Sequence, residues 1–84
     1  MRIYQSDVDI VQEVYAFCRM LKQPAEIALL AALNTAPRVV LQMIGLPNLR
    51  GMHPASVDMV MEVVINRAKD FPEELDKFMG YREI

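Results

Sequence analysis

The side chains that most often carry nucleophilic or metal chemistry are scarce in this sequence. Its 84 residues include one histidine, His53, and one cysteine, Cys18. A two-histidine metal site and a multi-cysteine zinc site are therefore excluded, and Cys18 with His53 is the only thiol–imidazole pair the chain can form. We expect Cys18 to fill space in the core, where a free cysteine behaves as a small hydrophobe, and His53 to be a surface loop residue.

Neighbouring carboxylates are the remaining candidates for general acid–base chemistry. They occur as Asp7 with Asp9, Glu73 with Glu74, and Glu74 with Asp76. Each pair lies near the expected start of a helix, where negative charge stabilises the helix dipole. The sequence contains no glycine-rich nucleotide-binding motif, zinc-protease motif or EF-hand motif. We therefore expect no catalytic residue, no cofactor and no metal, and a protein that is not an enzyme.

Composition and charge exclude several further classes of protein. Apolar residues make up 54% of the chain and charged residues 24%, with a net charge of −2. Such a chain is too apolar to be disordered, and its length suits one domain over residues 1–84. No uncharged apolar run reaches the roughly 18 residues of a membrane span, and the N-terminus lacks the apolar segment of a signal peptide. We expect a cytoplasmic protein that does not bind membranes, which also suits a single cysteine.

Prolines and glycines divide the chain into short helical segments. The first helix is expected to begin at Ser6, as its N-cap, and to end near Lys22 because Pro24 follows. Its apolar side chains recur every three or four residues and predict a wide inner face. That face comprises Ile10, Val11, Val14, Tyr15, Phe17, Cys18 and Leu21.

Four further helices are expected. The second runs from Ala25 to about Leu33 and ends at Asn34 in a left-handed conformation; the third runs from Pro37 to Gly45. A loop from Leu46 to Ala55 leads to the fourth helix, capped by Ser56, and the last helix runs from Pro72 to Met79. These elements predict an all-α fold, a compact orthogonal bundle of four to five short helices, and Met1 to Gln5 are free to form a short extended arm.

Excess apolar surface favours a protein that binds another protein. The second helix is apolar nearly all round, and the chain has seven methionines, a residue type suited to adaptable contacts. We expect an adaptor, inhibitor or regulator with a protein partner, and a homodimer formed through the second and fourth helices. The candidate partner-binding residues lie in the loop and on the polar side of the fourth helix. They are Leu46, Leu49, Arg50, Met52, His53, Met59 and Val63.

A helix-turn-helix regulator that binds DNA is the alternative. The second and third helices have suitable proportions for that motif. However, the segment from Pro37 to Gly45 offers only Arg38 and Gln42 to base edges and is otherwise apolar. We therefore do not expect nucleic acid to be the partner.

Overall fold

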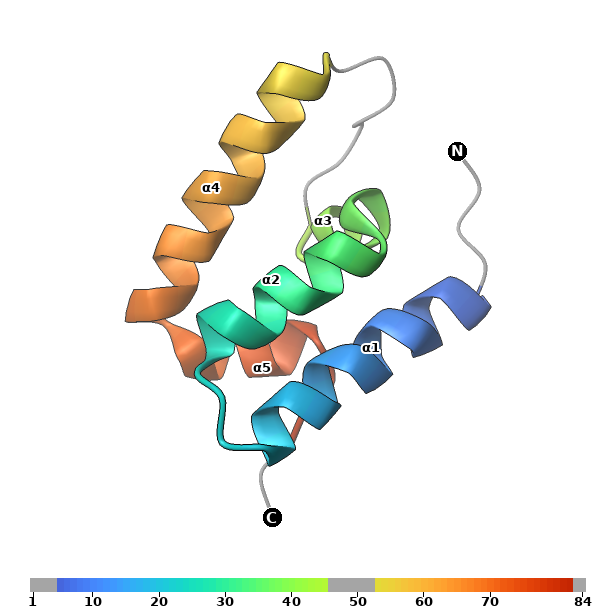
Figure 1. The fold of residues 1–84 in the computed structure, drawn as a ribbon, viewed down its shortest axis with the longest axis vertical. Coiled ribbons are helices and arrows are strands. Elements are labelled where there is room, and N and C mark those ends of the chain that lie inside the picture. Colours follow the sequence, from blue (N-terminus) through green and yellow to red (C-terminus); the bar gives the residue numbers. More distant parts are fainter. Residues whose placement is uncertain (1–4, 46–52, 83–84) are drawn as a thin grey trace.

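The computed structural model describes residues 5–45 and 53–82, and in these residues it contains five helices and no strand. The helices are α1 (Gln5–Met20), α2 (Ala25–Thr35), α3 (Pro37–Met43), α4 (Pro54–Asp70) and α5 (Pro72–Phe78). Helix α2 lies between α1 and α4, and α5 passes behind it (Figure 1). The predicted all-α compact bundle is confirmed. The expected arm lies outside the described residues except for Gln5, which begins α1.

Proline begins three of the helices. Pro37, Pro54 and Pro72 each occupy the first turn of α3, α4 and α5, where a missing N–H leaves no hydrogen bond unmade. Placing Pro54 in the loop and the cap at Ser56 was therefore wrong. Helix α4 is capped by His53, whose Nδ1 accepts a hydrogen bond from the backbone N–H of Ala55 at 3.1 Å.

Helices α1 and α2 end in two different ways. After α1, Lys22 adopts a left-handed φ of 66°, and the N–H groups of Lys22 and Gln23 bond back to the carbonyls of Arg19 and Cys18. Helix α2 does not end in a left-handed residue. The expectation that Asn34 adopts a left-handed conformation was therefore wrong. The helix ends at Ala36 with φ −153°, because a residue before proline, here Pro37, is excluded from helical geometry.

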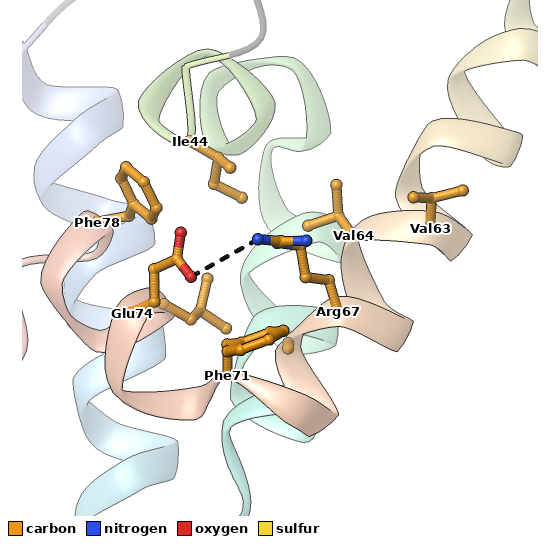
Figure 2. Close-up of a pocket in the computed structure, with 9 residues that line it drawn as sticks. Ile44, Val63, Val64, Arg67, Phe71, Glu74 and Phe78 are labelled. Atoms are coloured by element: carbon orange, nitrogen blue, oxygen red, sulfur yellow. Dashed lines mark ion pairs between the residues drawn. The ribbon is translucent and has the colours of Figure 1, made fainter.

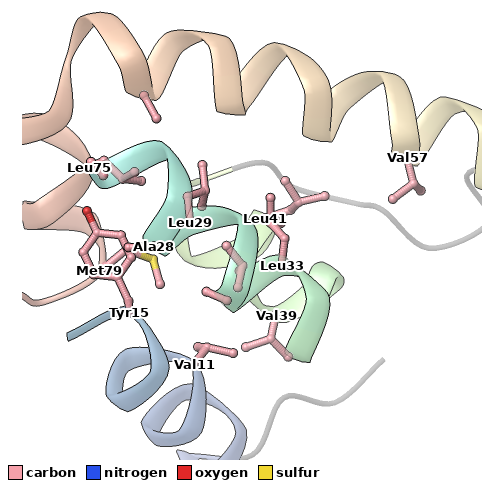
Figure 3. Packing of buried hydrophobic residues seen from close by; sticks show 14 residues of the cluster. Val11, Tyr15, Ala28, Leu29, Leu33, Val39, Leu41, Val57, Leu75 and Met79 are labelled. Carbon is pink, nitrogen blue, oxygen red and sulfur yellow. The ribbon is translucent and has the colours of Figure 1, made fainter. Parts of the chain in front are cut away.

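Helix α2 is the centre of the core. Its buried alanines and leucines pack between α1 on one side and α4 on the other, and Figure 3 shows Val11 and Tyr15 of α1 facing it. Among the described residues the core contains only apolar and tyrosine side chains. They are Val11, Tyr15, Ala25, Ala28, Leu29, Ala32, Leu33, Val39, Val40, Leu41, Val57, Ala68, Leu75 and Met79.

The wide inner face predicted for α1 is only partly buried. Val11 and Tyr15 are fully buried, whereas Ile10, Phe17 and Leu21 are exposed. The reason is the position of α1 at the edge of the bundle, where its neighbours cover only one stripe of the helix. Within the described ranges, no helix has the length and apolarity needed to cross a membrane.

Candidate functional site

An apolar groove lies between α4 and α5, and Ile44, directly after α3, also lines it. It has a volume of about 280 Å³. Figure 2 shows its walls converging from three different segments of the chain. The residues that line it, here called the α4–α5 groove, are Ile44, Val63, Val64, Arg67, Ala68, Phe71, Glu74, Leu75 and Phe78.

The junction between α4 and α5 creates the groove. A single residue, Phe71, separates the two helices, and the following Pro72 excludes it from helical geometry, with φ −130° and ψ 59°. The chain therefore turns sharply, and α5 lies against the end of α4 instead of continuing it. Ala68 and Leu75 are buried in the floor, while Phe71 and Phe78 remain partly exposed at the rim.

One ion pair crosses the mouth of the groove. Arg67 Nη2 lies 4.0 Å from Glu74 Oε2, and both side chains are about half exposed or more. Such an exposed pair contributes only about 0–1 kcal/mol, so it opens readily. The Arg67 guanidinium also lies 4.9 Å from the centre of the Phe71 ring, in cation–π contact. The groove therefore combines an apolar interior with a charged, easily rearranged rim.

A separate polar cluster joins α1 to α5. Asp76 accepts a hydrogen bond from the Tyr15 hydroxyl at 2.5 Å, and two from Arg19, through Nε at 3.0 Å and Nη2 at 2.9 Å. Tyr81 packs edge-on against Tyr15, with ring centroids 6.2 Å apart, and lies beside the Arg19 guanidinium. Tyr15, Arg19, Asp76 and Tyr81 are called the α1–α5 polar cluster below.

The side chains of the α1–α5 polar cluster stabilise the fold and do not form a reactive group. Burial of Tyr15 and its bond to the Asp76 carboxylate raise the pKa of the hydroxyl well above its ordinary value, so it stays protonated. The bond to Asp76 likewise raises the pKa of Arg19. Asp76 was expected to stabilise a helix dipole, and that interpretation was incomplete, because its carboxylate binds two side chains of α1.

The structure separates the residues proposed for partner binding. Leu46, Leu49, Arg50 and Met52 lie outside the described residues. His53 is exposed and caps α4. Met59 and Val63 are 68% and 66% exposed on α4, and of these two only Val63 lines the groove.

No catalytic pair forms between the thiol and the imidazole. Half-buried Cys18 lies in the last turn of α1, while His53 precedes α4 at the opposite end of the long axis (Figure 1). Across residues 5–45 and 53–82, no three His, Cys, Asp or Glu side chains come together in a way that could hold a metal ion.

Sequence reasoning missed most of the groove. Glu74 was interpreted only as a charge near the start of a helix, and Val63 was the one lining residue named as a partner-binding candidate. The signal that pointed to the site was Val63, an apolar residue on the polar side of the fourth helix. A second signal was available in Phe71–Pro72, because proline directly after a helix predicts a sharp turn.

Comparison with known proteins gives no relative from which a function could be transferred. No family model matches the chain, and neither a curated protein nor a solved structure is significantly similar to it.

Proposed function

We propose that this chain is a non-enzymatic, cytoplasmic protein-binding module, an adaptor or inhibitor, whose α4–α5 groove receives apolar side chains of a partner protein. The apolar groove interior supports this function most strongly. Its walls are Val, Ile, Leu and Phe side chains, and its two charged residues lie at the mouth. Partner proteins anchor themselves by placing large apolar side chains in pockets of this kind.

The open form of the groove favours a protein over a small molecule. Small-molecule sites commonly occupy about 300–1,000 Å³ and enclose most of the ligand. This groove is instead open to solvent, since Val63, Phe71 and Phe78 of its lining are exposed. Its lining of apolar side chains from α4 and α5 suits the apolar face of an amphipathic helix, which anchors through side chains three or four residues apart.

The competing functions have less support. DNA recognition by α3 would need an exposed polar face, but no residue of α3 is exposed, and Val39, Val40 and Leu41 are buried. Catalysis by Cys18 and His53 would need the two side chains within hydrogen-bond reach, and they lie at opposite ends of the molecule.

Selected peptides can test the groove before the natural partner is known. Helical peptides chosen from a random library for binding to the full chain are measured against wild type, Val63→Asp and Met59→Asp. The two positions lie on the same helix with almost equal exposure, but only Val63 lines the groove. We expect Val63→Asp to weaken binding at least about tenfold, because a charge is desolvated in an apolar pocket.

Met59→Asp is the matched control and should change affinity less than about twofold, a difference of about 0.4 kcal/mol. Circular dichroism is the check that both variants keep their helices. Equal affinity of all selected peptides for Val63→Asp and wild type would contradict the proposed function, as would a library that yields no binder.

A further inference from the structure

A second apolar surface lies on α1, away from the groove. Ile10, Phe17 and Leu21 are 48%, 64% and 57% exposed, and the half-buried Val14 lies between them. Positions 10, 14, 17 and 21 are separated by steps of four, three and four residues, the spacing by which two helices interlock their side chains. These four residues are called the α1 stripe.

The α1 stripe lies on the flank of α1 opposite α5. Arg19 reaches Asp76, so α5 lies along one flank of the helix. Because successive residues of a helix turn by about 100°, the α1 stripe falls on the other flank. Helix α2 exposes Ile27 and Leu30 on the side opposite its buried residues. Helix α5 packs against α2 and lies behind it in Figure 1. Since Ile27, Leu30 and the α1 stripe all lie on the sides of their helices away from α5, helix geometry puts them on one face of the molecule.

The exposed apolar area of this face is similar to the apolar area on one side of a protein–protein interface. Half-exposed large apolar side chains each present about 100 Å², so the five of α1 and α2 together present on the order of 500 Å². A standard interface buries about 800 Å² on each partner, of which about 60% is apolar. The face therefore supplies the apolar area of one side of such an interface, and it reaches the upper end of what a monomer usually exposes.

We propose that a second copy of this chain covers the α1 stripe, in a two-fold dimer whose α1 helices pair antiparallel. A stripe with this spacing is complementary to itself, as a two-fold interface requires. The dimer was expected through helices two and four. We place α1 in the interface instead of α4, because Val63 of α4 belongs to the groove.

The charges at the two ends of α1 favour antiparallel pairing of the two α1 helices. Asp7 lies on the same line as the α1 stripe, near the start of the helix, and Lys22 follows its end. Antiparallel pairing brings Asp7 near the partner's Lys22 and also aligns the two helix dipoles favourably. Parallel pairing would place Asp7 directly beside the partner's Asp7, which is unfavourable.

Sedimentation equilibrium of the full chain, over low to high micromolar concentrations, tests the dimer. Wild type should sediment with twice the chain mass of 9.6 kDa. Phe17→Asp should raise the dissociation constant at least about thirtyfold, and Leu21→Asp serves as a second variant on the same stripe. The matched control is Val63→Asp in the groove, where exposure is 66% against 64% at Phe17; it should leave the dimer intact.

Disulfide trapping tests the direction of pairing. In chains that also carry Cys18→Ser, a mixture of Glu13→Cys and Met20→Cys should oxidise mainly to the mixed dimer, because antiparallel pairing places these positions side by side. A wild-type monomer, a dimer lost in Val63→Asp but not in Phe17→Asp, or self-pairing in place of mixed pairing would overturn the proposal. Since the groove and the α1 stripe are probed by different variants, failure at one site is distinguishable from failure at the other.

Discussion

At the scale of single residues, Tyr15 makes stability depend on pH in the alkaline range. Burial and the Asp76 carboxylate raise the pKa of its hydroxyl in the folded chain above the value of about 10 that holds in the unfolded chain. Above pH 10 the unfolded chain therefore binds fewer protons at Tyr15 than the folded chain. The contribution of Tyr15 to the free energy of unfolding is therefore fully present below pH 10 and is lost as the pH rises further.

Tyr15→Phe tests this dependence. We expect the variant to lose about 1–3 kcal/mol of unfolding free energy at neutral pH, because a hydrogen bond to a charged acceptor is removed. Its unfolding free energy should then fall less steeply than that of wild type above pH 10. Urea unfolding between pH 8 and pH 11 measures both quantities, and equal slopes for the two proteins would show that another group causes the alkaline loss.

At the scale of elements, two helix ends with the same backbone conformation carry different residues. Lys22 after α1 and Gly80 after α5 have φ values of 66° and 68°. The following residues bond back into the last turn in the same way at both ends, Gln23 to Cys18 and Tyr81 to Asp76. Left-handed backbone strains a residue with a Cβ but not glycine.

We therefore predict opposite effects at these two ends. Lys22→Gly should raise the free energy of unfolding by about 0.5–1 kcal/mol, and Gly80→Ala should lower it by about 1–2 kcal/mol. An added Cβ at Gly80 would lie 2.8 Å from the Gln12 amide nitrogen. Because that amide ends a flexible side chain, we expect Gln12→Ala to rescue little of the loss. Chemical denaturation measures all of these variants, and a destabilised Lys22→Gly would contradict the explanation.

The same elements show what sequence alone can predict. Proline and glycine are local signals, so the existence and order of the helices followed from positions such as Pro24, Pro37 and Pro72. The cap was misplaced at Ser56, because no propensity rule anticipates a cap by the His53 ring. The exposure of Phe17 could not be predicted, since periodicity identifies an apolar stripe but not the neighbour that covers it. The Tyr15–Asp76 bond joins residues 61 positions apart, and Ile44 reaches the groove from a distant part of the chain, so no local pattern predicts either contact.

At the scale of the whole molecule, the groove and the α1 stripe occupy different parts of the bundle. A two-fold dimer built through α1 would display two copies of the groove, so that a partner with two binding segments would gain avidity without any new contact. The surplus of apolar residues in the sequence is thus divided between two exposed surfaces and a core centred on α2.

Dimerisation also predicts a thermal stability that depends on protein concentration. Because association favours the folded chain by mass action, the midpoint of thermal unfolding should rise as wild-type concentration rises. Phe17→Asp should remove this rise, whereas Val63→Asp should keep it. Thermal unfolding followed by circular dichroism over a hundredfold concentration range provides the measurement, and a midpoint independent of concentration in wild type would argue against the dimer.

The two sides of helix α5 contact different parts of the molecule, α1 on one side and the groove on the other. The helix spans seven residues, too few to be stable alone, so its position depends on its tertiary contacts. Asp76 holds it to α1, while Leu75 and Phe78 complete the groove wall on the other side. Occupancy of the groove and docking of α5 on α1 are therefore thermodynamically linked. A bound partner should slow hydrogen–deuterium exchange in the last turns of α1, which the partner does not touch.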